Sequence, residues 1–194
     1  PNVLLEPQDF LLIMASDKDR VDIISEWETI IDVGDSWYYF VATQQPPSNW
    51  NQLGFGSNGW SIGSSGFGYG DGDDNTEIPN TMSIYLIKTF SITNAEQVKE
   101  IAFHIDYDDG FVAYLNGQEF ARDNIVGSPP AFDQGTITWR EAEMINGGDP
   151  SLFWIDSTQA WVNEGQNTLA IQVHNFNSNS SDLSCIPFLT IGRD

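Results

Sequence analysis

The sequence of 194 residues has little of three things: cysteine, basic side chains and long apolar runs. Its one cysteine, Cys185, excludes an internal disulfide, and its neighbours Leu183 and Ile186 favour a buried, unreactive thiol. No apolar run approaches the roughly 20 residues of a membrane-spanning helix, so membrane insertion is not expected. The chain begins at Pro1 in mid-pattern without a signal peptide, which favours a piece of a larger protein.

Basic residues are scarce, because 7 Lys and Arg stand against 28 Asp and Glu, for a formal net charge of -21. Nucleic acids and anionic lipids bind through lysine and arginine, so neither is expected as a partner. The excess negative charge also repels itself in the compact state, and bound divalent cations or a salty medium would relieve that repulsion. Simple solubility is the alternative explanation, since net charge alone says nothing about fold.

Motifs for catalysis are missing as well. There is no Gly-x-Ser-x-Gly elbow, and the Gly- and Ser-rich segment 54–72 lacks the Gly-Lys-Ser/Thr ending of a phosphate-binding loop. Both histidines, His104 and His174, fall on predicted strand positions. A carboxylate pair for glycoside hydrolysis is defined by a separation in space, not in sequence. We therefore expect a noncatalytic protein.

Short apolar runs with period-two alternation dominate the chain and predict an all-β fold. The predicted strands are Phe10–Met14, Trp37–Ala42, Ser83–Phe90, Ile101–Asp106, Phe111–Leu115, Gln118–Arg122, Thr168–Val173 and Ile186–Ile191. Helical signals are limited to short turns at Ser157–Trp161 and Ala95–Lys99, the second with Asn94 as its cap. An antiparallel β-sandwich in a single domain spanning residues 1–194 fits this pattern best.

The dipeptide Asn116-Gly117 lies between two of these runs and predicts a tight hairpin. Both residues tolerate the positive φ of a type I′ turn, whose twist matches that of paired antiparallel strands. Just upstream, Asp108-Asp109-Gly110 ends another strand-like run. Two carboxylates are therefore expected at the mouth of a sheet.

Several stretches resemble the landmarks of a known module. They are Tyr107–Arg122, Gly66–Asp74, Tyr85–Phe90 and Gly165–Asn175, the last followed by Ser180–Leu183. Over residues 27–192 the chain resembles the galactose-binding-like jelly roll of large secreted bacterial multidomain proteins, which often neighbours lamin-tail-like and spore-coat-kinase-like domains. Residues 1–20 are similar to the end of a lamin-tail-like domain, and the Asp-Asp-Gly and Asn-Gly pair is similar to the PA14 β-sandwich.

This resemblance implies a jelly-roll sandwich and a secreted or cell-surface location. It implies as partners a polysaccharide or glycan and the neighbouring domains of the same polypeptide. It also implies calcium, which is usual in this fold, without identifying the ligands.

An acidic loop is the first candidate for a metal site. Its carboxylates are Asp71, Asp73, Asp74 and Glu77. Hard oxygen ligands clustered on a glycine-bearing loop suit Ca²⁺, which accepts several carboxylates in flexible geometry. The alternative is a solvated acidic turn of the kind that Asp and Gly favour.

A second candidate consists of Asp106, Asp108 and Asp109. In PA14-like lectins a neighbouring aspartate pair holds the calcium that binds sugar hydroxyls, and Asp108-Asp109 resembles that pair. The alternative is a tight turn whose Asp side chains accept hydrogen bonds from local backbone N–H groups.

The candidates for glycan contact are Trp60, Trp139, Arg140, Asp108 and Asp109. Trp60 lies on the Gly- and Ser-rich loop, and Trp139-Arg140 on the long connection after the hairpin. An indole face packs against sugar C–H groups, and a guanidinium donates to hydroxyls. The alternatives are that Trp60 closes the core, that Trp139 is buried, and that Arg140 pairs with Glu141 or Glu143.

The resulting hypothesis is a noncatalytic carbohydrate-binding-like module of a secreted or cell-surface multidomain protein, assisted by Ca²⁺. The competing hypothesis is a structural spacer or protein-docking module that binds no glycan. A third is a glycan-active enzyme that uses acidic residues. Fold alone does not choose among them, since one sandwich hosts many functions.

Overall fold

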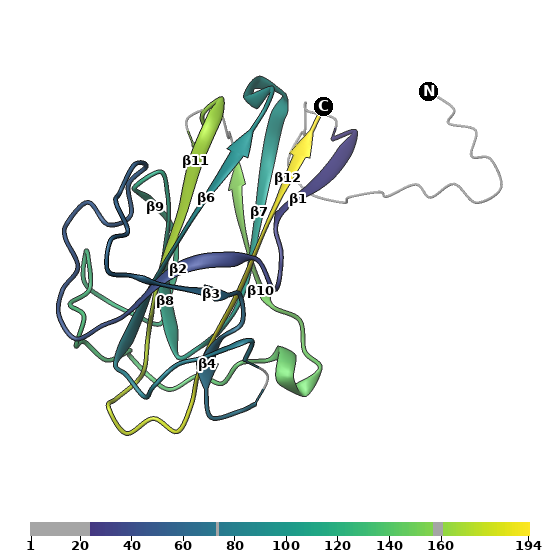
Figure 1. The fold of residues 1–194 in the computed structure, drawn as a ribbon. Helices are drawn as coiled ribbons and strands as arrows, with labels where there is room; N and C mark the ends of the chain where they lie inside the picture. The colour runs from purple at the N-terminus through teal and green to yellow at the C-terminus, as the bar shows by residue number, and fades with distance from the viewer. Residues whose placement is uncertain (1–23, 73, 157–160) are drawn as a thin grey trace.

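Two six-stranded β-sheets packed face to face form the protein (Figure 1). The computed structural model describes residues 24–72, 74–156 and 161–194. The strands are β1 (Glu26–Ile31), β2 (Ser36–Val41), β3 (Ser61–Ser64), β4 (Phe67–Tyr69), β5 (Thr76–Glu77), β6 (Ser83–Ile92), β7 (Val98–Asp108), β8 (Gly110–Leu115), β9 (Gln118–Asp123), β10 (Ser151–Asp156), β11 (Gly165–His174) and β12 (Leu183–Arg193). The helical turns in the described residues are the 3-10 turns η1 (Ala95–Gln97) and η2 (Met144–Asn146). The predicted all-β sandwich with short helical turns is confirmed.

The two sheets are named here after one central strand each. The β7 sheet has the order β10–β7–β12–β4–β5, and β1 also pairs with β12. The β11 sheet has the order β3–β2–β6–β11–β8–β9. Among the described strands, the pairing of β4 with β5 is parallel and the other pairings are antiparallel. β7 and β12 pair along nearly their whole length, which places Asp108 opposite Ser184.

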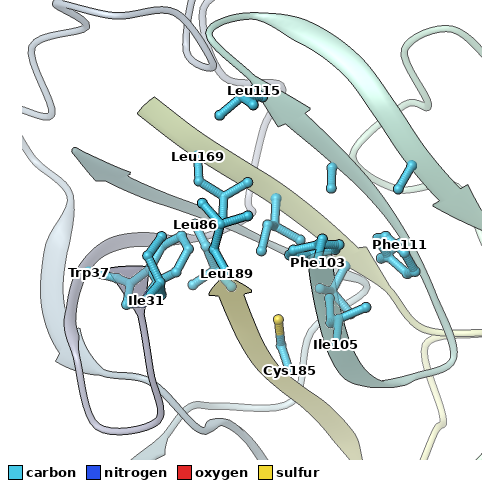
Figure 2. Close-up of a cluster of buried hydrophobic side chains, with 14 of the residues drawn as sticks. Ile31, Trp37, Leu86, Phe103, Ile105, Phe111, Leu115, Leu169, Cys185 and Leu189 are labelled. Atoms are coloured by element: carbon cyan, nitrogen blue, oxygen red, sulfur yellow. The ribbon is translucent and has the colours of Figure 1, made fainter. Parts of the chain in front are cut away.

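The main hydrophobic core lies between the two sheets. Leu169 of β11 shares one buried cluster with Phe103 and Ile105 of β7 (Figure 2). Cys185 of β12 is also part of this cluster and is fully buried. Burial raises the pKa of its thiol well above the ordinary value, which disfavours the reactive thiolate. The expectation of a buried, unreactive cysteine is confirmed.

The outer face of the β11 sheet is buried too. It carries a second apolar cluster of Trp50, Tyr85, Ile87, Val112, Tyr114, Ile125 and Ala170. Trp50 and Ile125 come from the loops after β2 and β9, which cover this face. Because β6 is buried on both faces, residues 84–87 form a continuous apolar run instead of an alternating one. Gln172 and His174, which alternate with core positions on β11, are fully buried for the same reason.

The hairpin predicted at Asn116-Gly117 is confirmed. These two residues join β8 to β9 with φ values of 52° and 84°, the positive values that a type I′ turn requires. The Asn116 side chain donates to Asn167 Oδ1 at 2.8 Å and accepts from the backbone N–H of Thr168 at 2.9 Å. The turn therefore packs against the beginning of β11.

The predicted cap at Asn94 is wrong. Its side chain makes no capping hydrogen bond, and its backbone is left-handed with a φ of 53°. The turn that follows is limited to Ala95–Gln97, because Val98 already begins β7. No helix in the described ranges is long or apolar enough to cross a membrane.

Five strands have no counterpart among the predicted ones, namely β1, β3, β4, β5 and β10. Strands β3 to β5 have at most four residues, and β3 and β4 lie in the Gly- and Ser-rich segment, so neither length nor apolar alternation marks them. The predicted strand Phe10–Met14 and residues 157–160 of the predicted helical turn lie outside the described residues.

Candidate functional site

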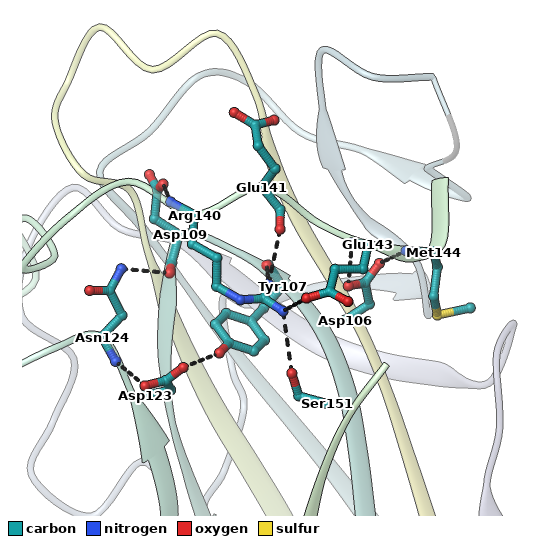
Figure 3. Close-up of polar contacts among 10 residues, drawn as sticks. All are labelled: Asp106, Tyr107, Asp109, Asp123, Asn124, Arg140, Glu141, Glu143, Met144 and Ser151. Carbon is teal, nitrogen blue, oxygen red and sulfur yellow. Dashed lines mark hydrogen bonds and ion pairs between the residues drawn. The ribbon is translucent and has the colours of Figure 1, made fainter. Parts of the chain in front are cut away.

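One end of the sandwich brings together three buried aspartates, Asp106, Asp108 and Asp109, where β7 ends and β8 begins. The carboxylate of Asp106 accepts hydrogen bonds from the backbone N–H groups of Glu143 and Met144, both at 2.8 Å. Figure 3 shows this pair of contacts beside the end of β7. Asp106 thus holds turn η2 of the long connection 124–150 against the sheet.

Asp109 joins two loops to the same strand end. Its Oδ1 accepts the backbone N–H of Arg140 at 2.6 Å, and its Oδ2 accepts that of Phe176 at 2.6 Å. Both donors lie far along the chain, so the expected alternative of a turn with only local hydrogen bonds does not describe this side chain. Asp109 fixes the connections 124–150 and 175–182 relative to each other.

Arg140 is occupied by contacts within the protein. Its guanidinium carbon lies 3.9 Å from the ring centroid of Tyr107, whose carbonyl oxygen also accepts a guanidinium N–H. A second nitrogen donates to Glu143 and to Ser151, at 3.1 and 3.3 Å. The Glu141 carboxylate points away from the guanidinium in Figure 3. Of the two pairings that the sequence left open, the structure has the one with Glu143.

Asp108 lies in a cluster of carboxylates. Oxygen atoms of Asp108, Glu141 and Asp182 all lie within 4.8 Å of one another. Asp108 is only 3% exposed, and its buried Oδ1 has no hydrogen-bond partner. Burial, with smaller contributions from nearby carboxylates that include Asp109 and Asp182, raises the pKa of Asp108 to about 8. Such a group of oxygen ligands can hold a metal ion.

The acidic loop after β4 reaches this cluster through Asp71. The Oδ2 atom of Asp71 accepts the Ser184 hydroxyl at 2.7 Å, while its Oδ1 is buried without a partner. The charge of Asp71 also contributes to the raised pKa of Asp108. Gly70 makes this approach feasible, because a Cβ there would lie 2.3 Å from the Ser181 carbonyl oxygen.

The other members of the predicted metal loop do not belong to the three-carboxylate group. Asp74 is partly buried near Gly68, where a Cβ would lie 2.3 Å from its Oδ1. Glu77 is exposed on β5. Asp73 lies outside the described residues. The structure thus brings Asp71 to Asp108 and leaves Glu77 on a separate strand.

The two predicted tryptophans differ in their surroundings. Trp60 is partly buried and stacks with both Phe40 and Trp50, with centroid distances of 5.6 and 6.2 Å. This agrees with the alternative that Trp60 closes an apolar cluster. Trp139 is 66% exposed, so the alternative of a buried indole is wrong.

A second aromatic surface lies on the outer face of the β7 sheet. Trp27 of β1 and Trp154 of β10 are 42% and 45% exposed, with ring centroids 5.8 Å apart. Gly192 of β12 makes room for Trp27, because a Cβ there would lie 3.0 Å from the indole. Neither tryptophan was a sequence candidate, since both lie on strands that the apolar pattern did not reveal.

A groove of about 620 Å³ borders the covered face of the β11 sheet. Its lining includes Trp50, Asn51, Gln52, Tyr114 and Glu119. The volume lies within the range of roughly 300–1,000 Å³ that is typical of small-molecule sites. Glu119 is held by two contacts to Arg122, at 2.5 and 2.7 Å. The amides of Asn51 and Gln52 and the hydroxyls of Ser48 and Ser128 also line the groove.

Sequence reasoning missed Glu141 and Asp182 as ligand candidates. Glu141 was considered only as a partner of Arg140, and Asp182 only as part of a family landmark. The pairing of β12 with β7 and β4 places the residue before β12 beside the end of β7. Without that pairing, nothing in the sequence links these carboxylates to Asp108.

No family model matches the sequence, and no curated protein matches it. Solved structures with a similar fold include a β-glucuronidase from glycoside hydrolase family 2, with a TM-score of 0.55 and 13% identity. A β-glucuronidase from an uncultured Clostridium sp. has the same two values, and a calcium-binding mutant of Bacteroides uniformis β-glucuronidase 2 has a TM-score of 0.53 and 12% identity. The alignments cover 89%, 95% and 86% of this chain and only 18%, 31% and 18% of those chains. With TM-scores of 0.53 to 0.55 and identities of 12–13%, these matches show a shared β-sandwich fold alone.

Proposed function

We propose that this chain is a noncatalytic carbohydrate-binding module of a secreted or cell-surface multidomain protein, with a galactose-binding-like jelly roll assisted by Ca²⁺. The observation that carries the proposal is the match of nearly the whole chain to a minor part of glycoside hydrolases. On this proposal, the domain accompanies a catalytic unit and supplies binding. The proposed role therefore lies in holding a glycan and not in cleaving it.

The proposed contact surface is centred on Trp139. Its indole is exposed, and it is next in sequence to Arg140, whose backbone N–H is held by Asp109. This anchoring keeps the segment in place while the ring stays free. Sugar C–H groups pack on such a ring, and a few exposed aromatics commonly supply most of the affinity at an interface.

Affinity electrophoresis in gels that contain neutral or acidic polysaccharides, run with Ca²⁺, tests the proposal. We expect the wild-type protein to be retarded and Trp139→Ala to lose retardation without a change in melting temperature. Trp154→Ala is the control, because it removes another exposed indole, 45% exposed against 66% for Trp139, from the β7 sheet. A double Asn51→Ala and Gln52→Ala variant tests the groove. If this variant loses retardation while Trp139→Ala does not, the glycan site lies in the groove and the proposed function stands.

A structural spacer or docking module is the second candidate function. The observation that favours it is the exposed Trp27–Trp154 pair, because exposed aromatic surface of this kind is typical of contacts with a neighbouring domain. On this alternative, the wild-type protein runs through every polysaccharide gel unretarded. Failure of the wild type to bind any glycan in Ca²⁺ would contradict carbohydrate binding and leave the spacer function.

The noncatalytic part of the proposal has its own measurement. Purified protein incubated with aryl glycosides and polysaccharides is expected to release no sugar above a buffer control. Release that disappears in Asp108→Asn would instead indicate the third hypothesis, an enzyme that uses acidic residues.

A further inference from the structure

The geometry points to a calcium site formed by the carboxylates of Asp108, Glu141 and Asp182, with Asp71 beside them. This differs from the loop of Asp71, Asp73, Asp74 and Glu77 that the sequence favours. The inference rests on the calcium part of the proposed function, and its tests involve no glycan.

The distances among the oxygen atoms suit one ion. Ca²⁺ binds oxygen ligands at about 2.3–2.6 Å, so two ligands on opposite sides of one ion are about 5 Å apart. The oxygens of Asp108, Glu141 and Asp182 lie within 4.8 Å of one another. A single cation can therefore contact all three side chains after small adjustments. Glu141 is exposed and Asp182 half-buried, which leaves room for the water ligands that complete a calcium shell.

The unpartnered oxygen of Asp108 is the second, independent observation. Asp106 and Asp109 each bind two backbone N–H groups, whereas Asp108 Oδ1 is buried and has no donor. Buried polar atoms are nearly always satisfied, and a buried carboxylate that lacks a donor is stabilised either by taking up a proton or by binding a cation. Asp71 Oδ1 is also buried without a hydrogen-bond partner, and this second unpartnered oxygen supports the same inference.

The charge at the site has the same consequence. Three carboxylates lie within 4.8 Å of one another and Asp108 is only 3% exposed, so their negative charges repel one another where water screens them poorly. A divalent cation offsets this repulsion. The ligands are all carboxylate oxygens, which suit Ca²⁺ and do not match the nitrogen and sulfur ligands typical of zinc.

Such an ion would join segments that are remote in sequence. Asp108 ends β7, Glu141 lies in the connection 124–150, and Asp182 precedes β12. Asp106 and Asp109 already hold two of these segments by backbone hydrogen bonds. The site is therefore largely formed before the ion arrives, and binding would increase stability with little rearrangement.

Calorimetric titration of chelator-treated protein with CaCl₂, together with Tb³⁺ luminescence, tests the inference. We expect one saturable site and a melting temperature that rises with Ca²⁺ but not with NaCl at the same ionic strength, because an ion that binds only the folded state stabilises it by mass action. Asp108→Asn and Glu141→Gln should each weaken Ca²⁺ binding by about tenfold or more, since affinity follows the number of charged ligands. Glu141 is exposed, so its variant retains the fold even if Asp108→Asn does not.

Glu96→Gln is the matched control, because it removes one exposed negative charge near the start of β7, at the opposite end of that strand from Asp108. It should bind Ca²⁺ like the wild type. The inference is overturned if no saturable site exists, or if Asp108→Asn and Glu141→Gln bind like the wild type. It is also overturned if Asp74→Asn or Glu77→Gln abolishes binding while Glu141→Gln does not. Binding of Ca²⁺ without any glycan retardation would support this site and contradict only the carbohydrate-binding proposal.

Discussion

Asp108 and Asp109 are neighbours in the chain and each is 3% exposed, yet the fold surrounds them in opposite ways. Asp109 accepts two backbone N–H groups, from Arg140 and Phe176. Asp108 has a buried oxygen without a donor and lies beside two further carboxylates. Burial of a carboxylate therefore does not reveal its role. Its hydrogen-bond partners do. A carboxylate with donors stabilises the fold, and a buried carboxylate without a donor indicates a site for a bound ion.

The largest expected effect in this comparison is a loss of stability at Asp109. Asp109→Asn retains the shape but replaces one acceptor by an amide N–H that faces a backbone donor. Charge-assisted hydrogen bonds contribute about 1.5–3 kcal/mol each, and an unsatisfied buried donor costs about as much, so we expect a loss of about 3–5 kcal/mol. Urea denaturation measures it, with Asp149→Asn on an exposed site as the control. An unchanged midpoint would mean that the two loops are not held by this side chain.

His174 is the next test, because it also combines a satisfied and an unsatisfied atom. Its Nδ1–H donates to the Gln134 carbonyl at 2.9 Å, whereas its buried Nε2 has no partner. Burial lowers the pKa of His174 to about 4, against the opposing effect of that hydrogen bond. The unfolded chain then binds a proton that the folded one does not, so stability falls as the pH decreases from about 6.5 to 4, by about 3 kcal/mol in all.

The measurement is the pH dependence of the free energy of unfolding for the wild type and for His174→Gln. The variant lacks the titrating group, so the difference between the two curves should change within that pH window and be constant above pH 7. Parallel curves from pH 4 to 7 would contradict the buried, neutral imidazole.

A smaller loss is expected at Asp106. Asp106→Asn removes one of the two hydrogen bonds that hold Glu143 and Met144. Turn η2 has no buried residues, so water satisfies the released N–H group, and we expect a loss of about 1–2 kcal/mol. Hydrogen exchange at residues 143–147 should accelerate while exchange at β11 stays slow. A loss as large as that of Asp109→Asn would show that the connection is held mainly here.

The smallest expected effect has the opposite sign and belongs to Asp108. In chelator and at a pH above about 8, where the carboxylate of Asp108 is ionised, Asp108→Asn removes a buried charge from a group of carboxylates without removing a hydrogen bond to Oδ1. We expect a gain of about 1 kcal/mol, or about 2–4 °C in melting temperature for a chain of this length. Differential scanning calorimetry measures it. A loss of stability in chelator would mean that the ionised carboxylate of Asp108 has a hydrogen-bond donor in solution. Asp108 and Asp109 would then not differ in whether their buried oxygens have donors.

Much of the fold was predictable because its causes are local. The hairpin follows from the backbone freedom of Asn116 and Gly117, and β6, β7, β8, β9, β11 and β12 follow from runs of apolar residues. Strands β3 to β5 were not predictable, since they are held by pairing and not by their own apolar pattern. β10 was missed although residues 152–155 are all apolar, with Leu152 and Trp154 exposed and Phe153 and Ile155 at least partly buried. The strand follows a long polar connection.

The candidate site was predictable only in part. Asp71 and Asp108 were named separately, as members of two different candidate sites, and the structure places them beside a single group of carboxylates. The sequence left open whether Trp139 is exposed or buried, and the structure shows it exposed, whereas Trp60 is stacked within an apolar cluster. Whether an aromatic on a loop faces solvent depends on which strand the loop crosses, and no local rule contains that information.

The sequence by itself determined the class of fold, the hairpin and the buried thiol, since each depends on composition or on a few adjacent residues. Only the tertiary structure decided which aspartate would be left without a donor. Glu141 and Asp182 approach Asp108 because β12 pairs with β7 and because Asp106 and Asp109 hold the connecting loops. Electrostatic and ligand-binding properties depend on distances in space, and strand pairing between remote segments sets those distances.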